Sequence, residues 1–148
     1  MFGFGKGSIE IQLEKYNFSP GETISGNASL KVKKQEKAKA VTIRLIGEQK
    51  TSNFSTVQKT STQTRKQYIY DFKQQLDKEK EYSGEYNYNF QIKIPQNILN
   101  SINSTLSAVM NSMQILTGQS SQIRWYLIAS LEIPWAIDIS KKVQINIA

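Results

Sequence analysis

The stretch from Tyr16 to Val32 reads YNFSPGETISGNASLKV, and its two halves together decide the fold. In the first half, Pro20 presets one backbone angle and Gly21 tolerates a positive one, so SPGE predicts a turn. In the second half, apolar or small residues alternate with polar ones, which is the period of a β-strand with one buried face. The residues of the buried parity are Ile24, Gly26, Ala28, Leu30 and Val32.

The same alternation recurs along most of the chain. Six further stretches show it, at residues 9–13, 41–46, 68–72, 86–94, 123–133 and 143–147. Strands with one apolar and one polar face are typical of antiparallel sheets that bury one side each. Two such sheets hide their apolar sides by stacking, which predicts an all-β, antiparallel β-sandwich of the immunoglobulin-like type with about seven or eight strands.

Two segments interrupt the strand pattern. Residues 51–64 are rich in Ser and Thr, which predicts a polar hairpin tip or loop. Residues 96–122 carry no charge, and their apolar residues recur at spacings of three and four, which predicts one helical insertion near 97–117. Its apolar face comprises Ile98, Ile102, Leu106, Val109, Met113 and Leu116. Either this face is buried in the domain's own core, or it is exposed and contacts a protein partner or a second copy of the chain.

Composition excludes several kinds of chemistry. The 148 residues include no cysteine and no histidine, so the chain has no thiol nucleophile, no Ser-His-Asp relay, no disulfide and no zinc site of the usual ligands. Glu22 has no second acid near it in the sequence and is interpreted as a turn residue. We therefore expect a protein that is not an enzyme and that uses no metal and no cofactor. The start resembles no signal peptide and no apolar run is long enough for a membrane span, which favours one cytoplasmic domain over 1–148.

The excess of basic over acidic residues suggests a second class of function. The net charge is +7, and a run of lysines lies in the segment LKVKKQEKAKAV, at Lys31, Lys33, Lys34, Lys37 and Lys39. We interpret the segment as a strand end, a turn and a strand start. Lysines at such a hairpin keep it soluble and discourage edge pairing. The alternative is an electrostatic surface for an acidic partner, nucleic acid or an anionic membrane.

Several pieces of the sequence, in this order, resemble the arrestin-fold superfamily. They are GETISG (Gly21–Gly26), VTIRLIG (Val41–Gly47), the strand ending in YNFQIKIP, and IRWYLIA (Ile123–Ala129). The opening MFGFGKGSIEIQL and the TGQSSQIRWYL segment are similar to the arrestin-fold subunit of the retromer complex. The resemblance implies a β-sandwich that acts as an adaptor for other proteins, as α-arrestins do in protein transport. Family members generally carry two sandwiches in tandem, whereas this chain has room for one.

Three functional hypotheses follow from these patterns. The first is a non-enzymatic adaptor or scaffold that binds a protein partner through a sandwich edge, a loop or the helical insertion. The second is an electrostatic binder of nucleic acid or of an anionic membrane surface through the lysine-rich hairpin, with peripheral membrane association. Nucleic acid is the weaker form of it, because only three of the 19 basic residues are arginines and the aromatic residues share the buried parity. The third is a homodimer, in which two copies supply the tandem arrangement.

Overall fold

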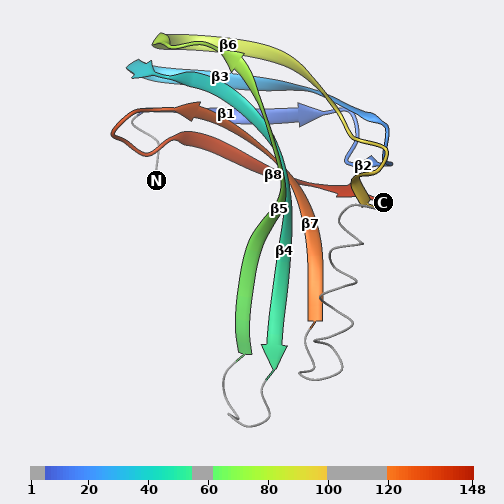
Figure 1. Cartoon of the computed structure of the whole chain (residues 1–148). Coiled ribbons are helices and arrows are strands. Elements are labelled where there is room, and N and C mark those ends of the chain that lie inside the picture. Colours follow the sequence, from blue (N-terminus) through green and yellow to red (C-terminus); the bar gives the residue numbers. More distant parts are fainter. Residues whose placement is uncertain (1–5, 55–61, 100–119) are drawn as a thin grey trace.

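The computed structural model describes residues 6–54, 62–99 and 120–148, which form eight β-strands (Figure 1). In chain order these strands are β1 (Gly7–Leu13), β2 (Asn17–Phe18), β3 (Thr23–Ala38), β4 (Ala40–Phe54), β5 (Thr62–Asp77), β6 (Lys80–Lys93), β7 (Ser120–Glu132) and β8 (Ile139–Ile147).

The strands form two sheets. One has three strands in the order β1-β3-β6, and the other has five in the order β2-β8-β7-β4-β5. All neighbouring strands are antiparallel except the short pair of β2 and β8. β1 packs against β8 and β7 of the other sheet. Figure 1 shows the three-stranded sheet above β8, while the lower parts of β4, β5 and β7 extend away from it. The prediction of an all-β, antiparallel fold is confirmed.

The core lies between the two sheets and follows the predicted alternation. Ile24, Ala28, Leu30 and Val32 of β3 are all buried, as are Val41, Ile43 and Leu45 of β4 and Leu127, Ala129 and Leu131 of β7. Phe90 on β6 is buried, and its neighbours Tyr86 and Tyr88 are partly buried against the same core. Burial of this apolar surface is the main stabilising contribution to such a fold.

The SPGE turn forms as the sequence predicts. Gly21 has a φ of 90°, which only glycine adopts without strain, and the Glu22 backbone N–H donates to the Ser19 carbonyl at 3.1 Å. The Glu22 carboxylate accepts a 2.7 Å hydrogen bond from the Ser19 N–H and forms an ion pair with Lys15. The hydrogen bond from Lys15 and that from Ser19 hold the pKa of Glu22 below its ordinary value. This carboxylate therefore closes its own turn.

The lysine-rich segment does not form the expected hairpin. β3 continues to Ala38, and the chain then crosses from the three-stranded to the five-stranded sheet at Lys39. Ala38 and Ala40 are both buried, and the Lys39 backbone N–H donates to the Glu132 carbonyl at 2.8 Å. A bulge between Val32 and Glu36 lets β3 continue past the lysines. Local alternation is the same before a hairpin turn and before a crossover to the other sheet, so the sequence could not separate the two.

Two predicted segments fall partly outside the described residues. β4 and β5 remain paired through Phe54 and Thr62, so strand structure extends further into 51–64 than we predicted, and residues 55–61 are outside the description. Of the helical insertion expected near 97–117, residues 100–119 lie outside the described residues. Ile98 is buried in the core, and Leu99 packs against it.

Candidate functional site

The open edges of the two sheets are the first surfaces to consider, because a sheet edge can accept an extended peptide by backbone hydrogen bonding. In the described residues, β5 pairs with β4 alone, while β1 and β6 each pair only with β3. The side of the sandwich at β1 is partly closed, since Lys141 on β8 forms an ion pair with Glu10 on β1 at 3.5 Å. β5 is also among the longest strands, at 16 residues.

The β5 edge carries two exposed aromatic side chains, Tyr68 and Phe72, which are 48% and 41% exposed. The sequence spacing predicts that both lie on one face of the strand. The register is irregular between Gly47 and Glu48, however, so Tyr68 lies opposite Glu48 while Phe72 lies opposite Leu45. Glu48 and Leu45 have opposite parity on β4, so the irregularity places the two aromatic residues on opposite faces of the edge.

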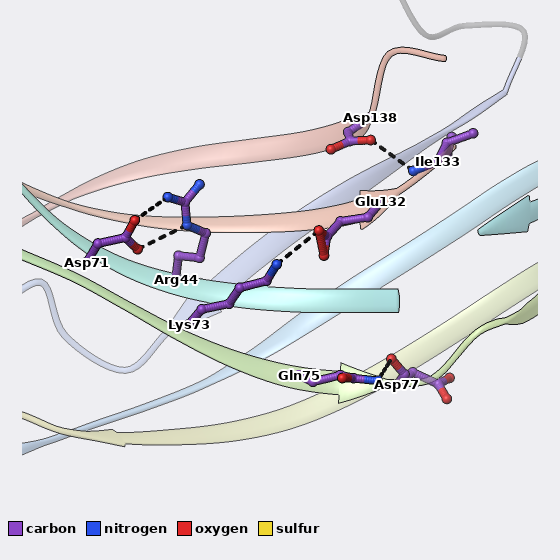
Figure 2. Close-up of polar contacts among 8 residues, drawn as sticks. All are labelled: Arg44, Asp71, Lys73, Gln75, Asp77, Glu132, Ile133 and Asp138. Carbon is purple, nitrogen blue, oxygen red and sulfur yellow. Dashed lines mark hydrogen bonds and ion pairs between the residues drawn. The ribbon is translucent and has the colours of Figure 1, made fainter. Parts of the chain in front are cut away.

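A set of polar contacts ties β5 to the rest of its sheet (Figure 2). Arg44 on β4 contacts Asp71 through two hydrogen bonds, with Nε at 3.2 Å from Oδ1 and Nη2 at 2.5 Å from Oδ2. The hydrogen bond to Asp71 raises the pKa of Arg44. Lys73 reaches Glu132 on β7 at 3.0 Å. These pairs hold β5 in place while leaving its outer edge open.

Further toward its N-terminal end, β5 brings positive charges together. Lys66 lies directly opposite Lys50 on β4, and Arg65 is the next residue along β5. Like charges that face each other across a strand pair are destabilising, by about 0.2 to 1 kcal/mol in magnitude. No ion pair of these three residues occurs within the described part of the chain. The sequence did not indicate the pair of Lys50 and Lys66, because these two residues become neighbours only through the β4–β5 register.

A groove of about 860 Å³ lies at the three-stranded sheet. Amide side chains from all three strands line it, including Gln12, Asn27, Asn89 and Gln91. The Asn27 amide donates to Asn89 Oδ1 at 3.0 Å, so part of this polar surface satisfies itself. Amide groups donate and accept hydrogen bonds but do not transfer protons at neutral pH. The carboxylate of Glu14 and the Gln74 side chain of β5 line the groove as well, so it offers hydrogen-bond donors and acceptors together with one acidic group.

The five lysines that the sequence singles out are spread along β3 and its end. Lys31 and Lys37 lie opposite Glu85 and Glu81 on β6, and the ion pair between Lys31 and Glu85 measures 3.9 Å. Lys33 and Lys34 lie at the bulge, and the Lys33 backbone N–H donates to the Lys6 carbonyl at 2.9 Å. Acidic side chains therefore alternate with these lysines, so the structure does not bring the five together as one uniformly basic surface.

The remaining sequence predictions concern the apolar face of the helical insertion, metal binding and membrane spans. Ile98 is a core residue, whereas Ile102, Leu106, Val109, Met113 and Leu116 lie outside the described residues. Within the described ranges, no group of acidic residues is arranged to hold a metal ion. The same ranges contain no helix that is long and apolar enough to cross a membrane.

The loop between β7 and β8, residues 133–138, carries the largest feature that sequence reasoning missed. Trp135 is fully exposed and Ile137 is 88% exposed. Pro134 marks the end of the preceding strand, and the residues after it continue an apolar pattern that gives no sign of exposure. The dipeptide of Pro and Trp in a turn could have drawn attention to this site.

Comparison with known proteins agrees with this architecture. A solved structure of the sporulation control protein Spo0M from Bacillus subtilis is similar, with a TM-score of 0.63 over 97% of this chain. The sequence identity is 16%, so this likeness shows the fold, and the match covers 50% of the Spo0M chain, which means that our chain spans half of its length. No curated protein matches.

The match to a protein family covers nearly all of the chain. The model described as arrestin (or S-antigen), N-terminal domain, matches residues 7–148. It includes the motifs on which the sequence resemblance rests, and the sandwich of three and five strands is the fold that the resemblance implies. The chain therefore belongs to the arrestin N-terminal domain family.

Proposed function

We propose that this chain is a non-enzymatic adaptor that binds an extended, acidic segment of a partner protein along the edge of β5. Membership of the arrestin family supports an adaptor role in general terms. The observation that carries the proposal is the open β5 edge, with Phe72 and Tyr68 exposed on its two faces.

The two aromatic residues would contribute affinity to such a complex. A peptide strand that pairs with β5 projects its side chains alternately to the two faces of the sheet. Its apolar side chains would then cover Phe72 on one face and Tyr68 on the other. Large aromatic side chains of this kind frequently dominate the binding energy of an interface.

The charges on β5 define the chemistry of the partner. Lys66 and Lys50 face each other with like charge, whereas Arg65 projects to the other face of β5, so an acidic side chain on the bound segment would relieve the repulsion between the two lysines. Asp71 and Lys73 are engaged by Arg44 and Glu132, so they present little net charge to a ligand. We therefore expect an extended segment with alternating apolar residues and at least one acid near Lys66.

Selection from a displayed library of random peptides tests the proposal. The purified chain should select peptides with alternating apolar residues and an acid, and their binding should slow hydrogen exchange at the amides of β5. Phe72→Ser should weaken a selected peptide by about tenfold. Lys66→Glu should weaken acidic peptides more than neutral ones, and this difference should shrink at high salt.

Tyr16→Ser is the matched control, since Tyr16 is as exposed as Tyr68 but lies next to β2. It should leave peptide binding unchanged. Protection of amides on another strand, with full affinity retained by Phe72→Ser, would place the binding surface elsewhere and contradict the proposal.

A further inference from the structure

The loop between β7 and β8 presents two apolar side chains to solvent without any cover from the described protein. Trp135 is 104% exposed, whereas the other tryptophan, Trp125, is 4% exposed in the core. Trp135 also has a φ of 63°, in the left-handed region that bulky residues rarely adopt. An exposed aromatic residue held in an unfavourable backbone conformation is a candidate for function, because the rest of the fold must hold it there.

The base of this loop is fixed by its own polar groups. The Ile133 backbone N–H donates to Asp138 Oδ1 at 2.8 Å, which closes the loop across its two ends (Figure 2). Pro134 has no N–H to donate. Residues 133 and 134 therefore present no free N–H, which lowers the cost of moving this part of the loop out of water.

Charges of both signs lie near the apolar tip, with the exposed Asp138 next to Ile137 and Lys39 beside the start of the loop. The Lys39 backbone N–H donates to the Glu132 carbonyl at 2.8 Å, so Lys39 lies beside the start of the loop. Its side chain is exposed and has no ion pair in the part of the chain that the structure describes. The carboxylate of Glu132 is already paired with Lys73 at 3.0 Å. The chain as a whole has a net charge of +7.

We propose that the β7–β8 loop is an anchor that inserts Trp135 and Ile137 into the interfacial region of an anionic lipid bilayer. Tryptophan favours the boundary between lipid headgroups and acyl chains, because its ring is largely apolar and its N–H is polar. Among the described residues both side chains are almost fully exposed, which suits entry into a deformable lipid phase. The net positive charge of the chain and the exposed Lys39 complement anionic headgroups.

This anchor is separate from the peptide edge that we propose on β5. Each surface can fail without the other, because peptide binding is measured without lipid and lipid binding without peptide. If both are correct, the domain holds a partner segment at β5 while the β7–β8 loop contacts the membrane.

The two tryptophans make the test direct. The full chain is titrated with phosphatidylcholine vesicles, with and without phosphatidylserine, while tryptophan emission is recorded. We expect a shift of emission to shorter wavelength that is larger with phosphatidylserine, together with quenching by lipids brominated on their acyl chains. The buried Trp125 should not respond, so the signal reports Trp135.

Variants of the loop separate anchoring from folding. Trp135→Asn keeps a residue that tolerates a positive φ, so it should fold normally, and the double variant with Ile137→Ser should reduce vesicle co-sedimentation by about tenfold or more. Lys39→Gln should reduce binding only to vesicles that contain phosphatidylserine. Tyr16→Ser is the control, because Tyr16 is an exposed aromatic residue beside β2, at the opposite end of the sandwich from this loop (Figure 1).

Three outcomes would overturn the proposal. One is the absence of any emission shift or co-sedimentation for the unmodified chain with either vesicle. Another is a shift that survives in Trp135→Asn, since Trp125 would then be its source. A third is co-sedimentation that the double loop variant retains in full, which would assign lipid binding to another surface.

Discussion

The phenolic hydroxyl of Tyr88 on β6 donates a 2.6 Å hydrogen bond to Oδ2 of Asp77 at the end of β5, and so joins the two sheets. Lys80 contacts the same carboxylate oxygen at 2.9 Å, and its ammonium group also lies 5.0 Å from the ring centre of Tyr86. Tyr86 in turn stacks on Tyr88, with an interplanar angle of 4°. The end of the sandwich at the β5–β6 turn is thus held by a partly buried polar and aromatic cluster.

This cluster predicts a loss of stability in acid. Partial burial alone would raise the pKa of Asp77, but the hydrogen bonds from Tyr88, Lys80 and the Lys78 N–H outweigh it and hold the pKa below its ordinary value of 3.8. A carboxylate with a lowered pKa in the folded state stabilises the fold above its unfolded-state pKa. Its contribution disappears as the pH falls below about 4 and through the folded-state pKa.

Tyr88→Phe tests this link between the sheets. The free energy of unfolding should fall by about 1 to 2 kcal/mol at neutral pH, because a hydrogen bond to a charged group is lost. The further decrease between neutral pH and pH 3 should be smaller than in the unmodified chain. Urea denaturation at both pH values measures the two effects, and Tyr16→Phe serves as control. An identical pH dependence in Tyr88→Phe and the unmodified chain would contradict the role given to Asp77.

A second prediction concerns alkaline pH. Burial, with a further contribution from the charge of Asp77, raises the pKa of Tyr82 to about 12. Because the folded-state pKa is raised, the neutral phenol stabilises the fold below about pH 10, and this contribution is lost as the pH rises from about 10 through 12. Burial also raises the pKa of Tyr70 and of Tyr88, so absorbance titration of phenolate formation should show a late step that moves to lower pH in urea and loses amplitude in Tyr82→Phe. The absence of that late step in the folded protein would show that Tyr82 is accessible to solvent.

A third prediction explains the glycine of the VTIRLIG motif. A Cβ atom on Gly47 would lie 2.7 Å from Cζ3 of Trp125, well inside contact distance. The indole cannot simply swing away, because it packs edge-on against Tyr70 with ring centres 6.0 Å apart. Gly47→Ala should therefore lower the free energy of unfolding by about 1 to 3 kcal/mol and alter Trp125 fluorescence.

Gly84→Ala is the comparison for this variant, because a Cβ at Gly84 meets no atom within 4 Å and introduces only the strain of a φ of 83°. Combining Gly47→Ala with Trp125→Phe should cost less than the sum of the two single changes, since the smaller ring gives the methyl group room. Strict additivity in thermal denaturation would argue against a direct clash.

A fourth prediction is a stabilising substitution. Thr42 on β4 is 1% exposed, and its hydroxyl oxygen has no hydrogen-bond partner among the described residues. Valine has nearly the same shape and no polar atom to leave unsatisfied. Thr42→Val should raise the free energy of unfolding by about 1 kcal/mol, as measured by urea denaturation. Thr23→Val, at an exposed position, should have little effect, and a destabilised Thr42→Val would indicate that the hydroxyl is bonded.

Much of the architecture could be predicted because alternation is a local property of the sequence. Ile24, Ala28, Leu30 and Val32 share one parity, and a strand projects residues of one parity to one face, so their burial follows from the period alone. The turn at SPGE was equally local. Pro20 restricts its own backbone angle and Gly21 permits a positive one, independently of the tertiary structure around them. Gly21 adopts the positive φ that the turn needs.

The candidate binding surfaces could be identified only from the folded chain. The bulge on β3 and the irregular register on β5 change which face of the sheet a side chain occupies. Neither can be recognised from the alternation of apolar and polar residues in the sequence. The lysine run therefore became the end of β3 and the crossover to the other sheet, and Tyr68 and Phe72 became aromatic residues on opposite faces of an edge. Lys50 and Lys66 became neighbours only through strand pairing.

By itself the sequence determined the strands, the face that each one buries and the family to which the chain belongs, because side-chain period and turn chemistry act over a few residues. Only the tertiary structure decided which edges stay open, which charges meet across β4 and β5, and that Trp135 and Ile137 extend beyond the core. These properties depend on the pairing of residues that are distant in the chain, and an apolar residue reads the same in the sequence whether the fold covers it or leaves it in water.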